Sequence, residues 1–270
     1  MRTSKKPSGM KAALAATLIV SGIALATPAL ADETAPPSDF KITGSAAIAS
    51  QYRFRGIAQS DNKPVVQGAI TVAHSSGFYL STWGSSASAG NSTVNIGGTE
   101  IDVYGGYTHA LGKSGVTADV GVYGYLYPGA PGGNYYEIYG NLSTTIGPVS
   151  AKAGVYHAPG QKNLRIYPTH HNTYVYGELS SAIPNTPFTV HGHLGHTGGA
   201  FDYTKQYIDY NVGVSTAWKN LTLDVSWVDT NVSRSDAAAV PFNDQTGTPS
   251  AFQTYRAAKG VGVVTLTAAF

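Results

Sequence analysis

Two groups of residues in this sequence could perform chemistry, one by nucleophilic attack and one by binding a metal ion. His74-Ser75-Ser76 places hydroxyl groups beside an imidazole, as nucleophilic catalysis requires. This stretch falls on a predicted tight turn, however, and no acidic or amide partner for a triad can be named. A hydrolase acting on membrane lipid is therefore a minor alternative, and we predict no catalytic residue.

Histidines provide the candidate metal ligands. His191 and His193 share one face of a predicted strand because they are two residues apart, and His170-His171 lie in a neighbouring loop. No carboxylate occurs in the same short stretch, and the chain has no Cys to supply a thiolate ligand. We therefore predict neither a metal site nor a cofactor.

The composition indicates what kind of structure must position any functional residue. Of the 270 residues, 42% are hydrophobic and only 12% are charged, about half the charged fraction usual in soluble domains. The mean hydropathy of −0.08 excludes a bundle of membrane helices, and a net charge of +2 gives no footprint for nucleic acid. Low charge, 32 Gly and 18 Tyr favour a β-structure whose exterior faces lipid.

The N-terminal segment has the features of a secretory signal. Basic residues precede the apolar run 12–26, and Ala29-Leu30-Ala31 matches a small-residue cleavage pattern. The apolar run is short for a membrane-spanning helix. We predict a signal peptide at residues 1–31, a periplasmic N-terminal segment at 32–39 and an outer-membrane β-barrel at 40–270.

Apolar and polar residues alternate with a period of two through the rest of the chain. Between residues 116 and 127, Val120, Val122 and Leu126 share one face, while Asp119 and Tyr123 share the other. A strand of about eleven residues tilted by ~40° is roughly 27 Å high, close to the ~25 Å apolar band of an outer-membrane barrel. The predicted strands are 40–56, 64–74, 77–86, 99–111, 115–127, 134–146, 149–157, 172–182, 187–197, 206–217, 221–230 and 257–270.

The connections alternate in length, which favours an all-β, antiparallel transmembrane barrel of about twelve strands. Short turns such as Ser75-Ser76-Gly77 and Gly147-Pro148 alternate with longer loops, of which 231–256 is the longest. In such barrels the short turns face the periplasm and the longer loops the outside. An even number of strands leaves no open edge in lipid. A soluble β-sandwich, the alternative fold, would need more Lys and Glu on its polar face.

The last predicted strand is amphipathic and ends in an aromatic residue. Val264, Leu266 and Ala268 share one face with the terminal Phe270. This arrangement resembles the signal that outer-membrane proteins present to their barrel insertion machinery. We therefore predict that machinery and outer-membrane lipid as partners.

If the apolar faces contact lipid, the polar faces line the interior. A charge on the lipid face at mid-bilayer costs roughly 2–4 kcal/mol, so the charged strand residues are assigned to the lumen. The bases gather on the first strand and the acids are spread over later strands, which predicts a basic wall opposite an acidic one. The predicted pore-lining residues are Lys41, Arg53, Arg55, Glu100, Asp102, Asp119, Glu137, Lys152, Glu178, Asp209 and Asp224.

Aromatic residues leave two interpretations of the lumen open. Inward tyrosines could form a stacking track for sugars or aromatic solutes, or they could fill space and hydrogen-bond to charged neighbours. Likewise, the charged groups could form a polar constriction or a plug of internal salt bridges. The inward tyrosines are Tyr104, Tyr123, Tyr125, Tyr135, Tyr139, Tyr156, Tyr174 and Tyr176, whereas Phe78, Tyr107, Trp218 and Trp227 are assigned to interface girdles.

One stretch of the chain is distinctive enough to indicate a family. It reads Tyr52-Arg53-Phe54-Arg55-Gly56-Ile57 and continues as Gln59-Ser60-Asp61-Asn62-Lys63-Pro64, with shorter matches such as Trp83-Gly84-Ser85 further on. These segments resemble the TorF family of porins, also catalogued as the Gcw_chp family. The resemblance covers roughly residues 40–228. It implies an exported outer-membrane barrel assigned to transport, without a known substrate.

Together these features predict a porin-like channel for passive diffusion of small polar solutes, without enzymatic activity, in the outer membrane of a Gram-negative bacterium. The excess of inward acids over inward bases predicts a weak preference for cations. The alternative is an occluded barrel with a structural or surface-interaction role, in which the loops rather than the lumen are functional.

Overall fold

A computed structural model of the chain describes residues 39–88, 96–164, 170–202, 204–239 and 250–270. The predicted signal peptide and all but the last residue of the segment 32–39 lie outside the described residues. Within the described ranges, no helix is long and apolar enough to cross a bilayer.

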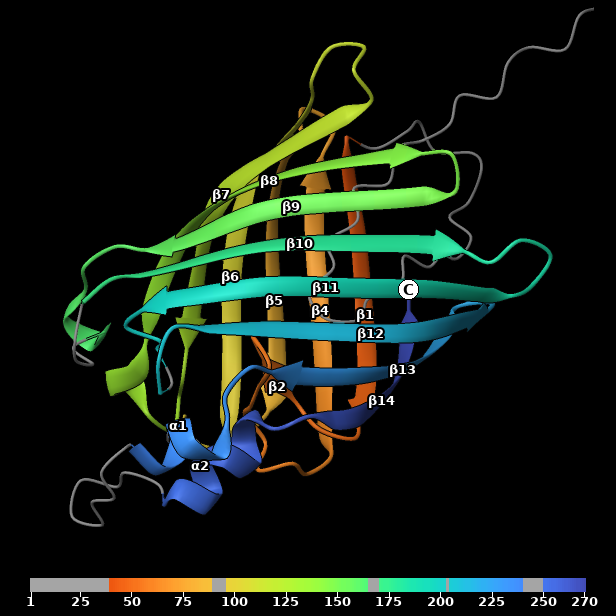
Figure 1. The fold of residues 1–270 in the computed structure, drawn as a ribbon. Coiled ribbons are helices and arrows are strands. Elements are labelled where there is room, and N and C mark those ends of the chain that lie inside the picture. Colours follow the sequence, from red (N-terminus) through yellow and green to blue (C-terminus); the bar gives the residue numbers. More distant parts are fainter. Residues whose placement is uncertain (1–38, 89–95, 165–169, 203, 240–249) are drawn as a thin grey trace, which may run out of the picture.

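Twelve strands form a closed antiparallel barrel, as predicted (Figure 1). The first wall strand pairs with both the second and the last, which closes the ring and leaves no free edge. The wall strands are β1 (Phe40–Ala49), β4 (Val65–His74), β5 (Phe78–Ser86), β6 (Thr99–Ala110), β7 (Val116–Leu126), β8 (Tyr135–Ile146), β9 (Val149–Ala158), β10 (Asn172–Ala182), β11 (Phe188–Gly199), β12 (Tyr207–Trp218), β13 (Leu221–Thr230) and β14 (Val261–Ala269).

The apolar faces of the strands point outward, which confirms the predicted sidedness. On β7, Val120 and Val122 are 54% and 52% exposed, whereas Tyr123 and Tyr125 are each only 4% exposed. Alternate residues of a strand point to opposite faces, so one apolar face and one polar face are enough to define the inside of a barrel.

Short turns gather at one end of the barrel, where the first and last strands also meet. The amide of Gly44 donates to the carbonyl of Phe270 (2.7 Å), and the amide of Phe270 donates back to Gly44 (2.9 Å). The turn between β8 and β9 is only Gly147-Pro148. We call this the short-turn end and the opposite end the long-loop end.

The predicted strand 40–56 is wrong at its C-terminal part. β1 ends at Ala49, and residues 50–64 form an inward segment that contains the two-stranded hairpin β2 (Arg53–Phe54) and β3 (Ile57–Ala58). Arg55 and Gly56 connect these strands with φ of +47° and +79°. Positive φ at both turn residues allows a two-residue hairpin, which alternation alone does not reveal.

The predicted strand 257–270 also starts too early. Residues Ala251–Ala258 form helix α2, whose first turn is fixed by a capping box between Ser250 and Gln253. β14 begins only at Val261. The predicted loop 231–256 further contains helix α1 (Arg234–Ala239), and both helices lie together at one end of the barrel (Figure 1). Two single-turn 3₁₀ helices, η1 (Pro131–Gly133) and η2 (Lys162–Leu164), occur in other long loops.

The inward segment packs against α2 at the long-loop end. Ile57 and Ala58 of β3 form a buried apolar cluster with Tyr207, Ala257 and Ala258. The hairpin is therefore held between the barrel wall and the helix.

Candidate functional site in the barrel interior

Tyrosines fill one half of the barrel interior, on the side of β6 to β9. Tyr104 stacks on Tyr123 with ring centroids 4.4 Å apart, and Tyr125 stacks on Tyr135 at 4.3 Å. Gly121 lies against the Tyr139 ring, where a Cβ atom would collide with the phenol. The rings pack on each other, which favours the interpretation of space-filling over an open stacking track in this half.

Tyrosine hydroxyls donate hydrogen bonds to carboxylates in this half of the interior. Tyr123 donates to Asp102 (2.9 Å) and Tyr79 donates to Asp119 (2.9 Å). The hydroxyls of Tyr79 and Tyr139 also contact each other. Buried carboxylates need such donors because desolvation is costly without them.

Arg55 reaches across the lumen and pairs with an acid on the far wall. Its Nη2 lies 2.6 Å from Glu137 Oε2, and both side chains are almost fully buried. Tyr125 donates to the same carboxylate oxygen (2.9 Å), while the guanidinium lies 4.3 Å from the Tyr174 ring centroid. The predicted basic wall opposite an acidic one is therefore wrong, because Arg55 leaves the wall and neutralises an acid directly.

Arg53 holds the inward segment to the end of α2. Its Nη1 donates to the carbonyls of Gly56 (2.8 Å), Ala257 (2.7 Å) and Lys259 (3.2 Å). Its Nη2 donates to Asn62 Oδ1 (3.0 Å). A planar guanidinium suits such a convergence of acceptors. Arg53 thus acts as a clamp for the segment rather than as a residue of the wall.

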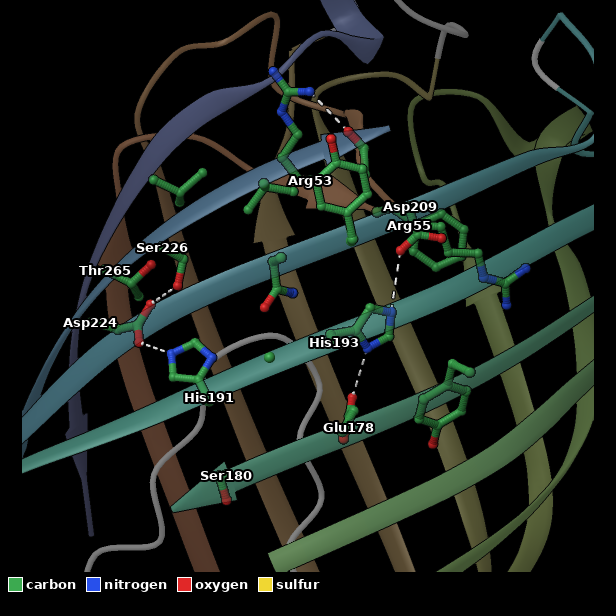
Figure 2. Close-up of a pocket in the computed structure, with 18 of the residues that line it drawn as sticks. Arg53, Arg55, Glu178, Ser180, His191, His193, Asp209, Asp224, Ser226 and Thr265 are labelled. Atoms are coloured by element: carbon green, nitrogen blue, oxygen red, sulfur yellow. Dashed lines mark hydrogen bonds and ion pairs between the residues drawn. The ribbon is translucent and has the colours of Figure 1, made fainter. Parts of the chain in front are cut away.

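Two histidines that the sequence analysis considered only as metal ligands face the interior. His193 lies between Glu178 and Asp209, with its Nδ1 3.2 Å from Glu178 and its Nε2 3.2 Å from Asp209 (Figure 2). His191 Nε2 lies 2.6 Å from Asp224 Oδ2. Residues of β11 alternate between the inside and the outside of the barrel. Applied to the histidines as it was to Asp and Lys, this alternation would have placed both His191 and His193 inside.

The remaining predicted residues occupy different parts of the interior. Glu100 is 1% exposed on β6, whereas Lys41 is exposed at the short-turn end of β1. Lys152 on β9 lies directly opposite Glu178 on β10, and its Nζ is 5.6 Å from the Tyr176 ring centroid. A role of the eleven residues in lining a conducting pore stays a prediction.

A cavity of about 410 Å³ occupies the other half of the interior, along β10 to β14. Figure 2 shows His191, Asp224, Ser226 and Thr265 around it, with Arg53 and Arg55 entering from the inward segment. Ser226 donates to Asp224 Oδ1 (2.5 Å). The cavity is lined from residues 52–56 at one end to Pro187 and Ala217 next to the short turns.

The stretch His74-Ser75-Ser76, considered above for nucleophilic catalysis, does not form a catalytic triad. His74 Nδ1 lies 2.7 Å from the Ser76 hydroxyl, while the nearby acid Asp39 accepts a hydrogen bond from Ser75 (3.2 Å) instead of from His74. A triad needs the base between the nucleophile and the acid. The stretch is exposed at a short turn, away from the cavity.

Outside the strands, an ion pair joins helix α1 to the loop that precedes β12. Lys205 Nζ lies 2.7 Å from Asp236 Oδ2. The hydrogen bond from Lys205, together with those from Ser233, lowers the pKa of Asp236 to about 2. Asp236 therefore keeps its charge, and the pair persists, at neutral and mildly acidic pH.

The closed barrel, its apolar exterior and its polar interior define an outer-membrane type of porin-like barrel. The chain belongs to the Gcw_chp family, described as bacterial protein of unknown function, whose model matches residues 33–258. That match confirms the family found from the sequence but not the TorF name.

Solved structures support the fold. The chain is similar to the KdgM porin, with 14% identity and a TM-score of 0.54, over 84% of this chain and 99% of that one. It is also similar to a KdgM porin in complex with disordered oligogalacturonate, with 13% identity and a TM-score of 0.52, over 85% and 98% of the two chains. No curated protein matches the sequence.

Proposed function

We propose that this protein is an outer-membrane channel for passive diffusion of small polar solutes. The observation that carries the proposal is the cavity along β10 to β14, whose lining combines carboxylates, histidines and hydroxyls inside a wall with an apolar exterior. Hydrated solutes cross a membrane where such groups replace part of their water. Passage through a polar lumen needs neither a cofactor nor a catalytic residue.

The proposed location is the outer membrane of a Gram-negative bacterium, with the short-turn end in the periplasm. The exposed apolar band and the porin-like fold support this location. The amphipathic strand β14, followed by Phe270, would present the insertion signal. The resemblance of residues 52–64 to the TorF porins supports a role in transport.

Liposome swelling with neutral sugars of graded size tests the channel directly. Purified, folded protein should admit a pentose quickly and larger oligosaccharides progressively more slowly, because the lumen is narrow. Liposomes without protein and with heat-unfolded protein are the controls. No permeation by the smallest sugar would reject the channel, and release of fatty acids from the same vesicles would support a lipid hydrolase instead.

An occluded barrel with a structural or surface-interaction role is the second candidate. The stacked tyrosines and the buried Arg55–Glu137 pair favour it, because together they fill one half of the lumen. The swelling assay separates the two candidates, since an occluded barrel inserts normally but passes no sugar.

A further inference from the structure

The two halves of the barrel interior differ in the size and charge of their inward side chains. β6 to β9 carry the stacked tyrosines, whereas the cavity side of β10 to β14 presents short groups such as Ser180, Thr189, Ser215 and Thr265. The sequences of β10 to β14 contain no Lys or Arg. A solute that crosses the lumen therefore meets the β10 to β14 side, whose strands carry no cationic Lys or Arg side chain.

Carboxylates dominate the charge of that side. Three carboxylates of this side, Glu178 on β10, Asp209 on β12 and Asp224 on β13, line the cavity. Of the two arginines that also line it, Arg55 is balanced by Glu137. Arg53, which donates to the backbone carbonyls of Gly56 and Ala257, adds one positive charge. Against these three carboxylates stand Arg53 and the histidines His191 and His193, so this side of the cavity is negative while at least one of the two histidines is neutral.

Two of the carboxylates have acceptor capacity that the described residues do not use. Glu178 and Asp209 are 8% and 3% exposed, and each gives one oxygen to His193. The other oxygen of each, Glu178 Oε2 and Asp209 Oδ2, has no hydrogen-bond donor among the described residues. Both side chains line the cavity from facing positions around His193 (Figure 2). These two oxygens are themselves buried, so they add negative charge beside the cavity rather than a direct contact with a solute.

We infer that the cavity selects small hydrophilic primary amines, the class that amino sugars represent. A primary ammonium offers three donors and no acceptor, which suits a lining of carboxylates on strands that carry no Lys or Arg. The positive charge of the ammonium is attracted by these carboxylates, and the hydroxyls of an amino sugar match Ser180, Thr189, Ser215 and Thr265. This inference rests on the proposed channel function and names the solute class for that channel.

Three sugars of nearly equal size separate the effect of charge from that of size. Proteoliposomes loaded with a mixture of glucosamine, glucose and glucuronate, in symmetric KCl to suppress diffusion potentials, are sampled for the solute released. We expect glucosamine to leave about threefold faster than glucose, and glucuronate to leave most slowly. A factor of about three is what the attraction of one unit charge roughly 6 Å away produces in water-like surroundings.

Variants then assign the preference to the cavity. Asp224→Asn should reduce the glucosamine-to-glucose ratio, and Glu178→Gln should do the same. Asp229→Asn is the matched control, because Asp229 lies on the same strand as Asp224 but contacts Tyr210 on the outer face. Asp224→Asn keeps the test valid if Glu178→Gln does not fold, since Asp224 contacts neither Glu178 nor the Arg55 pair.

The outcomes distinguish the two claims. If none of the sugars is released, the channel itself is rejected and the solute class with it. If glucose is released as fast as glucosamine, or glucuronate is fastest, the channel stands and the amine selectivity is overturned. A glucosamine preference that Asp224→Asn and Glu178→Gln both leave unchanged would also overturn the assignment to this cavity.

Discussion

Individual charged residues in this barrel serve both the fold and the lumen. Arg55 is the clearest case, because it pairs with Glu137 (2.6 Å) and lies over the Tyr174 ring while it also borders the cavity. Breaking one side of a buried ion pair leaves an uncompensated charge, which costs more than removing both partners. Arg55 therefore influences both the stability of the barrel and the width of the path.

We predict that Arg55→Ala raises the single-channel conductance and lowers stability. The truncation widens the end of the cavity and leaves Glu137 without its cation, at a cost of about 3–5 kcal/mol. The double variant Arg55→Ala/Glu137→Gln should lose less stability while keeping the higher conductance. Planar-bilayer recording and urea unfolding in vesicles measure the two effects. An unchanged conductance would show that Arg55 lies outside the solute path.

The alternation of residues along each strand predicts well which charged side chains point inward. It does not predict which of them pair with each other. Glu137, Glu178 and Asp224 lie inside because a charge on the lipid face is costly, and that rule needs no three-dimensional information. The contact between Arg55 and Glu137 joins positions 82 residues apart. It depends on the inward segment 50–64, which the alternation of residues in the sequence cannot reveal.

At the scale of elements, the inward segment and α2 decide how much of the lumen is closed at the long-loop end. Gly56, at the tip of the hairpin, lies so close to β12 and β13 that a Cβ atom would be 2.5 Å from Thr230 Cγ2 and 2.9 Å from Asp209 Cβ. Its φ of +79° also favours glycine. The tip is thus fixed against the wall by both conformation and packing.

We predict that Gly56→Ala loosens the hairpin, whereas Gly112→Ala does not. Both glycines have positive φ, but a Cβ at Gly112 would meet nothing within 4 Å. Gly112→Ala should therefore cost roughly 1 kcal/mol from backbone strain alone. Gly56→Ala should cost roughly 1–3 kcal/mol more through overpacking and should increase the fluctuations of the open-channel current. Equal stability and equal current noise in the two variants would contradict the packing of the hairpin tip.

The wall strands were predictable from sequence, and the elements that fill the end of the barrel were not. Strands such as β7 repeat apolar and polar residues over their whole length, so their pattern is unambiguous. α2 has only eight residues, and only Lys259 and Gly260 separate it from β14. Its Ser250 and Gln253 are spaced as a capping box, a sequence signal that could have identified its first turn.

At the scale of the whole molecule, the barrel combines a packed half with an open half. Tyrosines and the Arg55–Glu137 pair stabilise the first, and short polar groups with carboxylates line the second. This division reconciles the two interpretations that the sequence left open. A plug and a polar path occupy different sides of one lumen in the proposed channel.

The charge of the open half predicts a modest preference for cations. In a bilayer under a KCl gradient, the sign of the reversal potential should show that K⁺ permeates more easily than Cl⁻. Asp224→Asn should move the reversal potential toward zero, and the outward-facing control Asp229→Asn should leave it unchanged. Clear anion selectivity of the unmodified protein would refute this prediction.

The central claim is a water-filled path along β10 to β14, and cysteine accessibility tests it most directly. The chain has no Cys, so single substitutions report one position each. Ser215 and Thr265 line the cavity on either side of Asp224 and serve as the probes. Val225, 51% exposed on the outer face, and Tyr104, buried among the stacked rings, are the controls. With a charged, membrane-impermeant thiol reagent, Ser215→Cys and Thr265→Cys should react quickly and lose current. Val225→Cys and Tyr104→Cys should stay unmodified. The claim would be contradicted if Val225→Cys were labelled rapidly while Ser215→Cys and Thr265→Cys did not react.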